Sequence, residues 1–95
     1  MRRAAWTQTA TDDLREAERY LTGIHEAIAR DLVERAVAAG RFSLDYPAIG
    51  SPMRGRWRKW RIPGTRYLLI YRPTPSGIEI GRVRYGRSRW TLVPA

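Results

Sequence analysis

Three runs of sequence decide the fold: WRKWRI at residues 57–62, YLLIYR at residues 67–72 and IEIGRVRY at residues 78–85. All three belong to one stretch that reaches from Trp57 to Trp90. The outer two runs alternate basic and apolar residues, which is the pattern of half-buried strands. The linkers PGT (63–65) and PTPSG (73–77) are turn signals too short for a crossover connection. The three strands are therefore predicted to be consecutive neighbours and antiparallel.

The middle strand is apolar on both faces, which predicts a position inside the sheet with both faces covered. The last strand has a conflict of register. Strict alternation would place Arg82 and Arg84 on the same face as Ile80. A β-bulge at Gly81 would return Val83 to the apolar face and turn both arginines out. We therefore predict an irregularity at this glycine.

Two helices are predicted before the strands. The first follows an N-cap at Thr9 or Thr11, has Asp12 and Asp13 in its first turn, and ends at Gly23. Its apolar stripe is Ala10, Leu14, Ala17 and Leu21, with Tyr20 beside it. The second helix begins near residue 24 and runs to residue 40 or a little beyond. Its predicted buried side is Ile28, Leu32, Val33, Ala36 and Val37.

A short edge strand is predicted at residues 3–7, with Trp6 as its core anchor. The order of elements is then β-α-α-β-β-β. This order predicts an α+β fold in which a helix hairpin packs on a twisted antiparallel sheet. No linker or repeat divides the chain, so residues 1–95 are expected to form a single domain.

The charge of the chain is unevenly placed. The net charge is +9, from 18 basic and 9 acidic residues. Residues 1–50 carry 7 basic and 8 acidic side chains, whereas residues 51–95 carry 11 basic side chains and a single acidic one, Glu79. A strongly cationic sheet half favours an acidic partner for one face, either nucleic acid or an acidic protein segment. The alternative is an Arg-rich surface that only keeps the protein in solution.

Composition excludes several kinds of chemistry. Cysteine is absent, so disulfides and thiolate nucleophiles are excluded. The one histidine, His25, has no clustered carboxylates near it in sequence, so it is interpreted as a surface helix residue and no metal site is expected. No run approaches the ~20 apolar residues of a membrane span, and the start lacks the apolar run of a signal peptide. We expect a cytoplasmic protein without a cofactor or a membrane contact.

Arg and Tyr side chains remain as the source of chemistry. Tyr can transfer a proton and Arg can stabilise charge on a reacting phosphate, but the same side chains also bind phosphates without reacting. Composition alone favours binding, because clustered Arg is common and a tuned Arg–Tyr site is rare.

Four motifs cover nearly the whole chain in order and spacing. They are Trp6 with Ala10 and Asp13-Leu14; Pro47-Ala48-Ile49-Gly50; the run from Tyr67 to Pro73; and Ile78-Glu79-Ile80-Gly81-Arg82-Val83 followed by Tyr85 to Arg89. With these motifs the chain resembles the RelE/ParE toxin superfamily, on the ParE side.

The resemblance implies a small bacterial toxin of a type II toxin–antitoxin system. ParE-like members are associated with inhibition of DNA gyrase, whereas RelE-like members cut messenger RNA on the ribosome. The resemblance also implies a cognate antitoxin whose C-terminal segment wraps the toxin, and an acidic segment of this kind would suit the cationic sheet. A heterotetramer with the antitoxin is compatible with this interpretation.

Two differences from the RelE-type ribonucleases favour the ParE branch. Those enzymes typically have an Arg directly after the Tyr that opens the central strand, whereas Leu68 follows Tyr67 here. They also have a Tyr several residues beyond the Arg of the last strand, whereas residues 89–92 read RWTL. The ParE pattern often has His-Gly where Tyr85-Gly86 stands. If the chain were a nuclease, Tyr85 and Arg87 would be its catalytic candidates.

The candidate contact residues come from the first and third of the three strands and from the segment after them. Lys59 and Arg61 share a face with Trp57 and either form a nucleic-acid platform or cover the tryptophan. Arg82 either contacts a partner or bridges the sheet to the C-terminal tail. The full set for target or antitoxin contact is Lys59, Arg61, Arg82, Arg84, Tyr85, Arg87 and Arg89.

The leading hypothesis is a non-catalytic toxin that binds a protein target, DNA gyrase. The alternatives are a ribosome-dependent endoribonuclease that cuts mRNA, and a plain binding module for nucleic acid or an acidic peptide.

Overall fold

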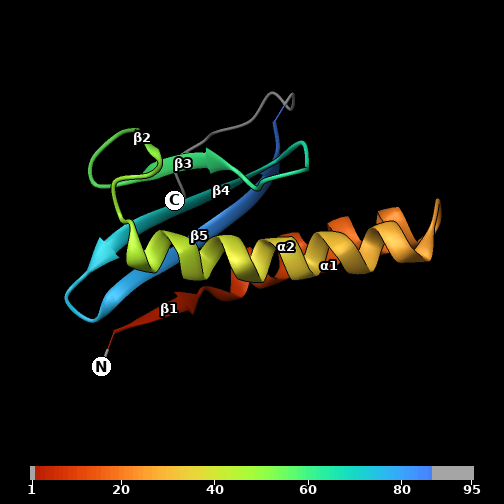
Figure 1. Ribbon diagram of the computed structural model, residues 1–95, viewed down its shortest axis with the longest axis horizontal. Helices are drawn as coiled ribbons and strands as arrows, with labels where there is room; N and C mark the ends of the chain where they lie inside the picture. The colour runs from red at the N-terminus through yellow and green to blue at the C-terminus, as the bar shows by residue number, and fades with distance from the viewer. Residues whose placement is uncertain (1, 87–95) are drawn as a thin grey trace.

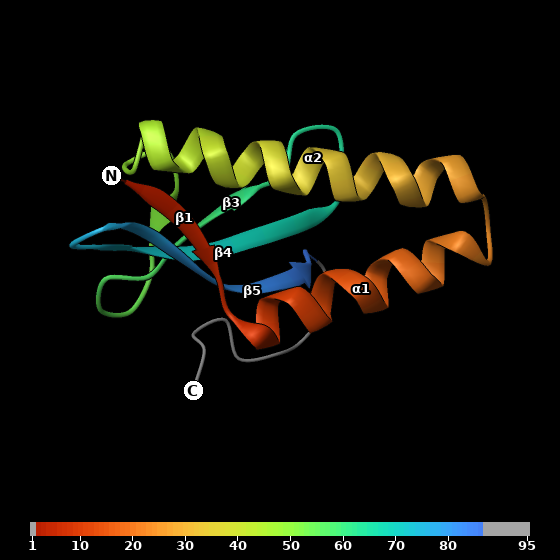
Figure 2. The same ribbon diagram turned by 90° about the horizontal axis from the view of Figure 1, so that it is seen from below.

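The computed structural model describes residues 2–86, which fold into two layers. The elements in chain order are β1 (Arg3–Trp6), α1 (Gln8–Thr22), α2 (Glu26–Asp45), β2 (Ser51–Pro52), β3 (Arg58–Arg61), β4 (Tyr67–Thr74) and β5 (Gly77–Tyr85). The antiparallel helices α1 and α2 cover one face of a five-stranded sheet (Figures 1 and 2). The predicted α+β fold with a helix hairpin on a sheet is confirmed. Residues 87–90 of the stretch from Trp57 to Trp90 lie outside the described residues.

The sheet has the strand order β1-β5-β4-β3-β2. Its pairs are antiparallel except for β1 and β5, which are parallel, so the sheet is mixed and the prediction of a wholly antiparallel sheet is wrong at this edge. Short turns fix the direction of β3, β4 and β5, but the helix hairpin separates β1 from them and leaves its direction open. The sequence also missed β2, because two residues are too few to show any periodicity.

The predicted bulge in the last strand is confirmed. Ile70 pairs with Arg82 whereas the next residue, Tyr71, pairs with Ile80, so Gly81 is the extra residue in β5. The bulge turns Val83 towards the helices, where it is 3% exposed.

The core lies between the helices and the sheet. The middle strand β4 supplies its centre with Leu69 and Tyr71, and Ile70 is fully buried on the opposite face of the sheet, as predicted for an interior strand. Trp60 packs at one side of the core, and its Nε1 donates a 2.8 Å hydrogen bond to Oγ of the fully buried Ser43. The main cluster of buried residues is Ala10, Leu14, Ala17, Leu32, Ala36, Ala39, Ile62, Leu69, Tyr71, Ile78, Ile80 and Val83.

The start of α1 differs from the prediction. The N-cap is Thr7, whose Oγ1 accepts a 3.0 Å hydrogen bond from the N–H of Ala10. The helix therefore begins at Gln8, and Asp13 lies beyond the first turn. Its carboxylate contacts β5 instead, at Arg82 and Val83. The predicted end at Gly23 is confirmed, because this glycine is the C-cap.

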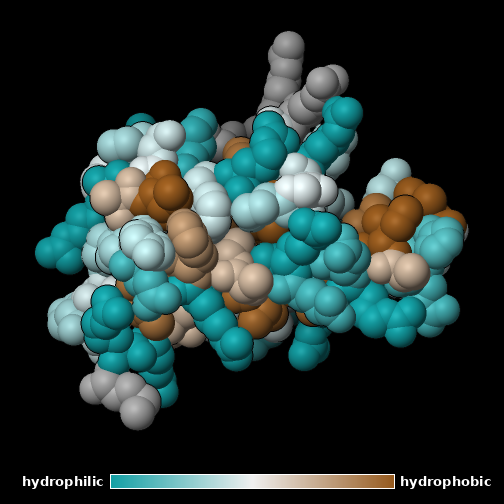
Figure 3. Space-filling view, viewed as in Figure 1, coloured by the Kyte–Doolittle hydropathy of each residue, from teal (hydrophilic) through white to brown (hydrophobic). Residues whose placement is uncertain are grey.

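The buried side of α2 is only partly the predicted one. Leu32 and Ala36 are buried, but Ile28 is 51% exposed and Val37 is 40% exposed. The reason is the close approach of the helix to the sheet: a Cβ atom at Gly40 would lie 2.9 Å from Cδ1 of Ile80. Apart from Leu32, the residues of the inner face are therefore small, and other large apolar side chains lie on its flanks. Apolar side chains gather at the joined end of the hairpin, which extends beyond the sheet (Figures 1 and 3).

The connector between α2 and β2, residues 46–50, is held by the buried side chain of Tyr71. Its hydroxyl donates to the carbonyl of Pro47 at 2.6 Å and accepts the N–H of Gly50 at 3.0 Å. A Cβ atom at Gly50 would lie 2.9 Å from Cε1 of the same ring, so only glycine fits this approach. Burial raises the pKa of Tyr71 above its ordinary value of 10.0, so folding favours the protonated hydroxyl that makes these two hydrogen bonds.

Candidate functional site

The sheet face that points away from the helices carries most of the candidate cations. Since Trp60, Leu69 and Val83 point into the core, the residues beside them in each strand point to the opposite face. The register aligns these side chains in two cross-strand rows. The rows are Arg61–Leu68–Arg84 and Lys59–Ile70–Arg82. Lys59, Arg61, Arg82 and Arg84 are thus brought onto one surface, here called the basic face.

One member of the basic face is already paired within the protein. Nε of Arg82 lies 2.8 Å from Oδ2 of Asp13, and the two side chains are only 19% and 13% exposed. The same carboxylate oxygen accepts the N–H of Val83 at 3.1 Å. This contact fastens α1 to β5 beyond the point where β1 ends. Arg82 therefore has an internal partner, on α1, within the described residues.

Trp57 is covered by a different cation from those considered in the sequence. The guanidinium carbon of Arg72 lies 4.8 Å from the ring centroid, which is a cation–π contact. Nη2 of Arg72 also lies 2.9 Å from Oε1 of Glu79. Lys59 and Arg61 share the face of Trp57 by alternation, but the cation stacked on its ring comes from β4.

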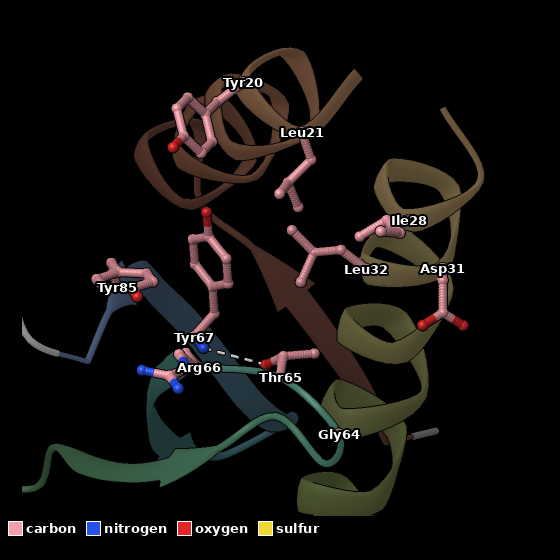
Figure 4. Close-up of a pocket in the computed structure, with 10 residues that line it drawn as sticks. All are labelled: Tyr20, Leu21, Ile28, Asp31, Leu32, Gly64, Thr65, Arg66, Tyr67 and Tyr85. Carbon is pink, nitrogen blue, oxygen red and sulfur yellow. Dashed lines mark hydrogen bonds between the residues drawn. The ribbon is translucent and has the colours of Figure 1, made fainter. Parts of the chain in front are cut away.

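Tyr85 lies in a cluster of three tyrosines at the end of the sheet (Figure 4). Its ring contacts that of Tyr67 edge to face, with centroids 5.5 Å apart. The pKa of Tyr67 is raised above 10.0, first by burial and then by the neighbouring Tyr20 and Tyr85. The raised pKa means that the surroundings of Tyr67 favour its neutral phenol over the phenolate.

The tyrosines line a groove between the helix hairpin and the end of the sheet. Its volume is about 730 Å³. The hydroxyl of Tyr67 points towards Tyr20 and Leu21, and the backbone N–H of Tyr67 donates to Thr65 at 3.0 Å (Figure 4). The lining residues are Tyr20, Leu21, Ile28, Asp31, Leu32, Gly64, Thr65, Arg66, Tyr67 and Tyr85. This surface is called the hairpin groove.

The sequence identified one of these groove residues, Tyr85, as a candidate. For Ile28 the signal was the width of the apolar stripe on the second helix. A stripe from Ile28 to Val37 is wider than one helix can bury against this sheet, so part of it had to remain exposed. Arg87 and Arg89, the last two candidates, lie outside the described residues.

His25 is the N-cap of α2, and its Nδ1 accepts a 3.2 Å hydrogen bond from the N–H of Ala27. It is exposed, as expected for a surface residue. Within residues 2–86, no group of three or more His, Cys, Asp or Glu side chains could hold a metal ion. Neither described helix is long and apolar enough to cross a membrane.

Comparison with known proteins connects this fold to a family. A solved structure of the chromosomal ParDE toxin–antitoxin system from P. aeruginosa superimposes with a TM-score of 0.75, covering 90% of this chain and 96% of that chain at 20% sequence identity. At this identity the likeness shows the fold. No curated protein is significantly similar in sequence. The model of the family described as "ParE toxin of type II toxin-antitoxin system, parDE" matches residues 4–90. The chain therefore belongs to the ParE toxin family of type II toxin–antitoxin systems.

Proposed function

We propose that this ParE-type toxin stops growth by binding a protein target, DNA gyrase, and does not cut RNA. The observation that supports this most is the identity of the residue at the centre of the basic face. Leu68 lies there between Arg61 and Arg84, at the position where RelE-type ribonucleases typically have an Arg. An aliphatic side chain at this point has no group that could stabilise charge on a reacting phosphate.

The antitoxin is proposed to bind the basic face through its acidic C-terminal segment. Lys59, Arg61 and Arg84 lie on one surface, and residues 51–95 carry 11 basic side chains against one acidic side chain. Carboxylates from an extended acidic segment would be steered to this surface and held by it. A heterotetramer of toxin and antitoxin in the cytoplasm fits this proposal.

Induction of the chain alone in cells tests the proposed target. Growth arrest with a DNA-damage response and intact reporter mRNA is expected. The purified chain should also inhibit supercoiling by gyrase. Cleavage of mRNA within translated codons, abolished by Tyr85→Phe or Arg87→Ala, would instead establish the ribonuclease alternative. Absence of growth arrest would leave the plain binding module.

A charge-reversed variant tests the antitoxin site. Lys59→Glu with Arg61→Glu should weaken the binding of antitoxin at least about tenfold, since repulsion replaces two attractive contacts. The matched control is Arg15→Glu with Arg30→Glu, which makes the same change of charge on exposed helix surfaces. Equal weakening in the two variants would show that the net charge matters and the basic face does not, and unchanged affinity in Lys59→Glu with Arg61→Glu would also refute the site.

A further inference from the structure

Four basic side chains follow one another along β3 and the turn before it. Arg54 and Arg56 lie in the β2–β3 turn, and Lys59 and Arg61 lie on β3. Figure 1 shows this turn and β3 on the side of the sheet farthest from β1. The distance from Arg56 to Arg61 is about 16 Å, at about 3.3 Å per residue of extended chain. These four residues are called the cationic row.

Negative charge is scarce around the cationic row. Residues 46–78 contain seven basic residues and no acidic one. In the part of the chain that the structure describes, every acidic residue except Glu79 belongs to α1 or α2, and the two helices cover the opposite face of the sheet (Figure 2). Glu79 lies two strands away from β3 and is paired with Arg72 at 2.9 Å. A polyanion that approaches the row is therefore attracted by it and meets no repelling carboxylate beside it.

The charges of the row are available to a ligand. Between residues 2 and 86, none of its four side chains takes part in an ion pair. Arg61 donates to the carbonyl of Thr65 at 3.4 Å, which leaves the other N–H groups of its guanidinium for a ligand. Arg72 and Arg82 differ in this respect, because a carboxylate of the protein already neutralises each of them.

The β2–β3 turn presents two of these cations clear of the body of the protein. The N–H of Met53 donates to the carbonyl of Trp57 at 2.8 Å, and the N–H of Trp57 donates to the carbonyl of Arg54 at 3.3 Å. At the tip, Gly55 has a φ of 65°, and a Cβ atom there would meet nothing within 4 Å. Arg54 and Arg56, on either side of it, are exposed. The turn is thus the end of a narrow two-stranded ribbon, a shape that the major groove of B-DNA admits.

The aromatic ring beside the row is already covered. Trp57 shares the face of Lys59 and Arg61, but it is only half-exposed and the guanidinium of Arg72 lies over its ring, 4.8 Å from the centroid. Binding of a single strand relies on stacking of bases on aromatic rings, whereas binding of a duplex backbone needs only cations. One strand of duplex DNA carries a phosphate every ~3.4 Å along the axis, so a row of about 16 Å faces about five phosphates.

We propose that the cationic row binds the phosphate backbone of duplex DNA without base specificity, with the β2–β3 turn at the groove and β3 along one strand. This inference goes beyond the proposed function and does not depend on gyrase, because the chain alone makes these contacts. Lys59 and Arg61 also belong to the basic face proposed for the antitoxin, whereas Arg54 and Arg56 serve the DNA alone.

The salt dependence of DNA binding tests the proposal. The probe is a fluorescein-labelled duplex of about 20 base pairs, and fluorescence anisotropy measures its affinity for the purified chain. Four phosphate contacts predict that the affinity falls about 150-fold between 50 and 200 mM NaCl. Arg54→Ala with Arg56→Ala leaves two contacts, so its affinity should fall only about 12-fold over the same range. Both changes lie in an exposed turn, so the variant should fold, which circular dichroism would check.

The matched control is Arg15→Ala with Arg30→Ala, which removes two exposed cations from the helices and should keep the fall of about 150-fold. The same salt dependence in the turn variant and the helix variant would show that only the net charge binds DNA. A single strand of equal length should bind more weakly than the duplex, and equal or tighter binding would overturn the duplex assignment. Absence of duplex binding at 50 mM NaCl would overturn the proposal outright.

An acidic protein segment is the other polyanion that the row could take. A polyglutamate peptide that binds more tightly than a duplex of equal charge, and loses as much affinity in the turn variant, would give the row to such a segment. Failure of the proposed function looks different. If the chain does not inhibit gyrase but binds the duplex through Arg54 and Arg56, gyrase is the wrong target and the DNA site stands.

Discussion

The contact of Asp13 with β5 gives the sharpest prediction about stability. The β1–β5 ladder ends at the pair Trp6–Ile80, and beyond it α1 lies against the open edge of β5. Asp13 supplies the missing acceptor there, because its carboxylate binds the N–H of Val83 at 3.1 Å and Nε of Arg82 at 2.8 Å. Asp13→Ala would leave a backbone N–H without its acceptor and a largely buried guanidinium without its counter-charge.

The expected cost follows from the burial of the pair. Removing one partner of a fully buried ion pair costs ~3–5 kcal/mol, and a hydrogen bond to a charged group contributes ~1.5–3 kcal/mol. The side chains of Arg82 and Asp13 keep 19% and 13% of their exposure, which places the loss near the lower limit, at about 3 kcal/mol. A chain of this length has a total stability of ~5–14 kcal/mol. The melting temperature of Asp13→Ala should therefore fall by roughly 12–24 °C.

Urea unfolding followed by circular dichroism measures this loss. The matched control is Asp12→Ala, which removes the neighbouring exposed carboxylate and its 2.8 Å contact with Gln8, and should change the free energy of unfolding by less than about 0.5 kcal/mol. A double-mutant cycle with Arg82→Ala should give a coupling of at least about 1 kcal/mol. The reasoning is refuted if Asp13→Ala costs no more than Asp12→Ala, or if the two changes at Asp13 and Arg82 are additive.

Three further outcomes follow from the core. Gly50→Ala should lower the free energy of unfolding by about 2 kcal/mol in urea titrations, since its Cβ would lie 2.9 Å from the Tyr71 ring; an unchanged value would show that the connector can move aside. Folding raises the pKa of Tyr71, so the stabilisation from its protonated hydroxyl is complete below pH 10.0 and is lost as the pH rises past that value. The free energy of unfolding, measured by urea titration, should therefore fall above pH 10.0. It should fall less steeply in Tyr71→Phe, which has no hydroxyl to ionise. Trp60→Phe removes the hydrogen bond to the buried Ser43 and should cost ~1–3 kcal/mol in thermal unfolding, whereas Trp60→Phe combined with Ser43→Ala should recover part of that cost.

The sequence by itself determined the local features of the fold. Turn chemistry at residues 63–65 made β3 and β4 antiparallel, and alternation broken at Gly81 required a bulge. Residue period and turn residues act over a few neighbours in the chain, so these features can be recognised without knowledge of distant contacts. The neutral helical half and the cationic sheet half were also evident from the order of residues alone.

Tertiary structure decided which of these local features meet. The parallel pairing of β1 with β5 and the ion pair between Asp13 and Arg82 join segments that are more than half the chain apart, and no local pattern encodes such a contact. Asp13 looked like a first-turn carboxylate until Thr7 proved to be the cap. Ile28 was predicted to be buried because it lies on the apolar stripe of the second helix. The hairpin extends past the sheet at the end where Ile28 lies, and Ile28 remains exposed there in the lining of the hairpin groove.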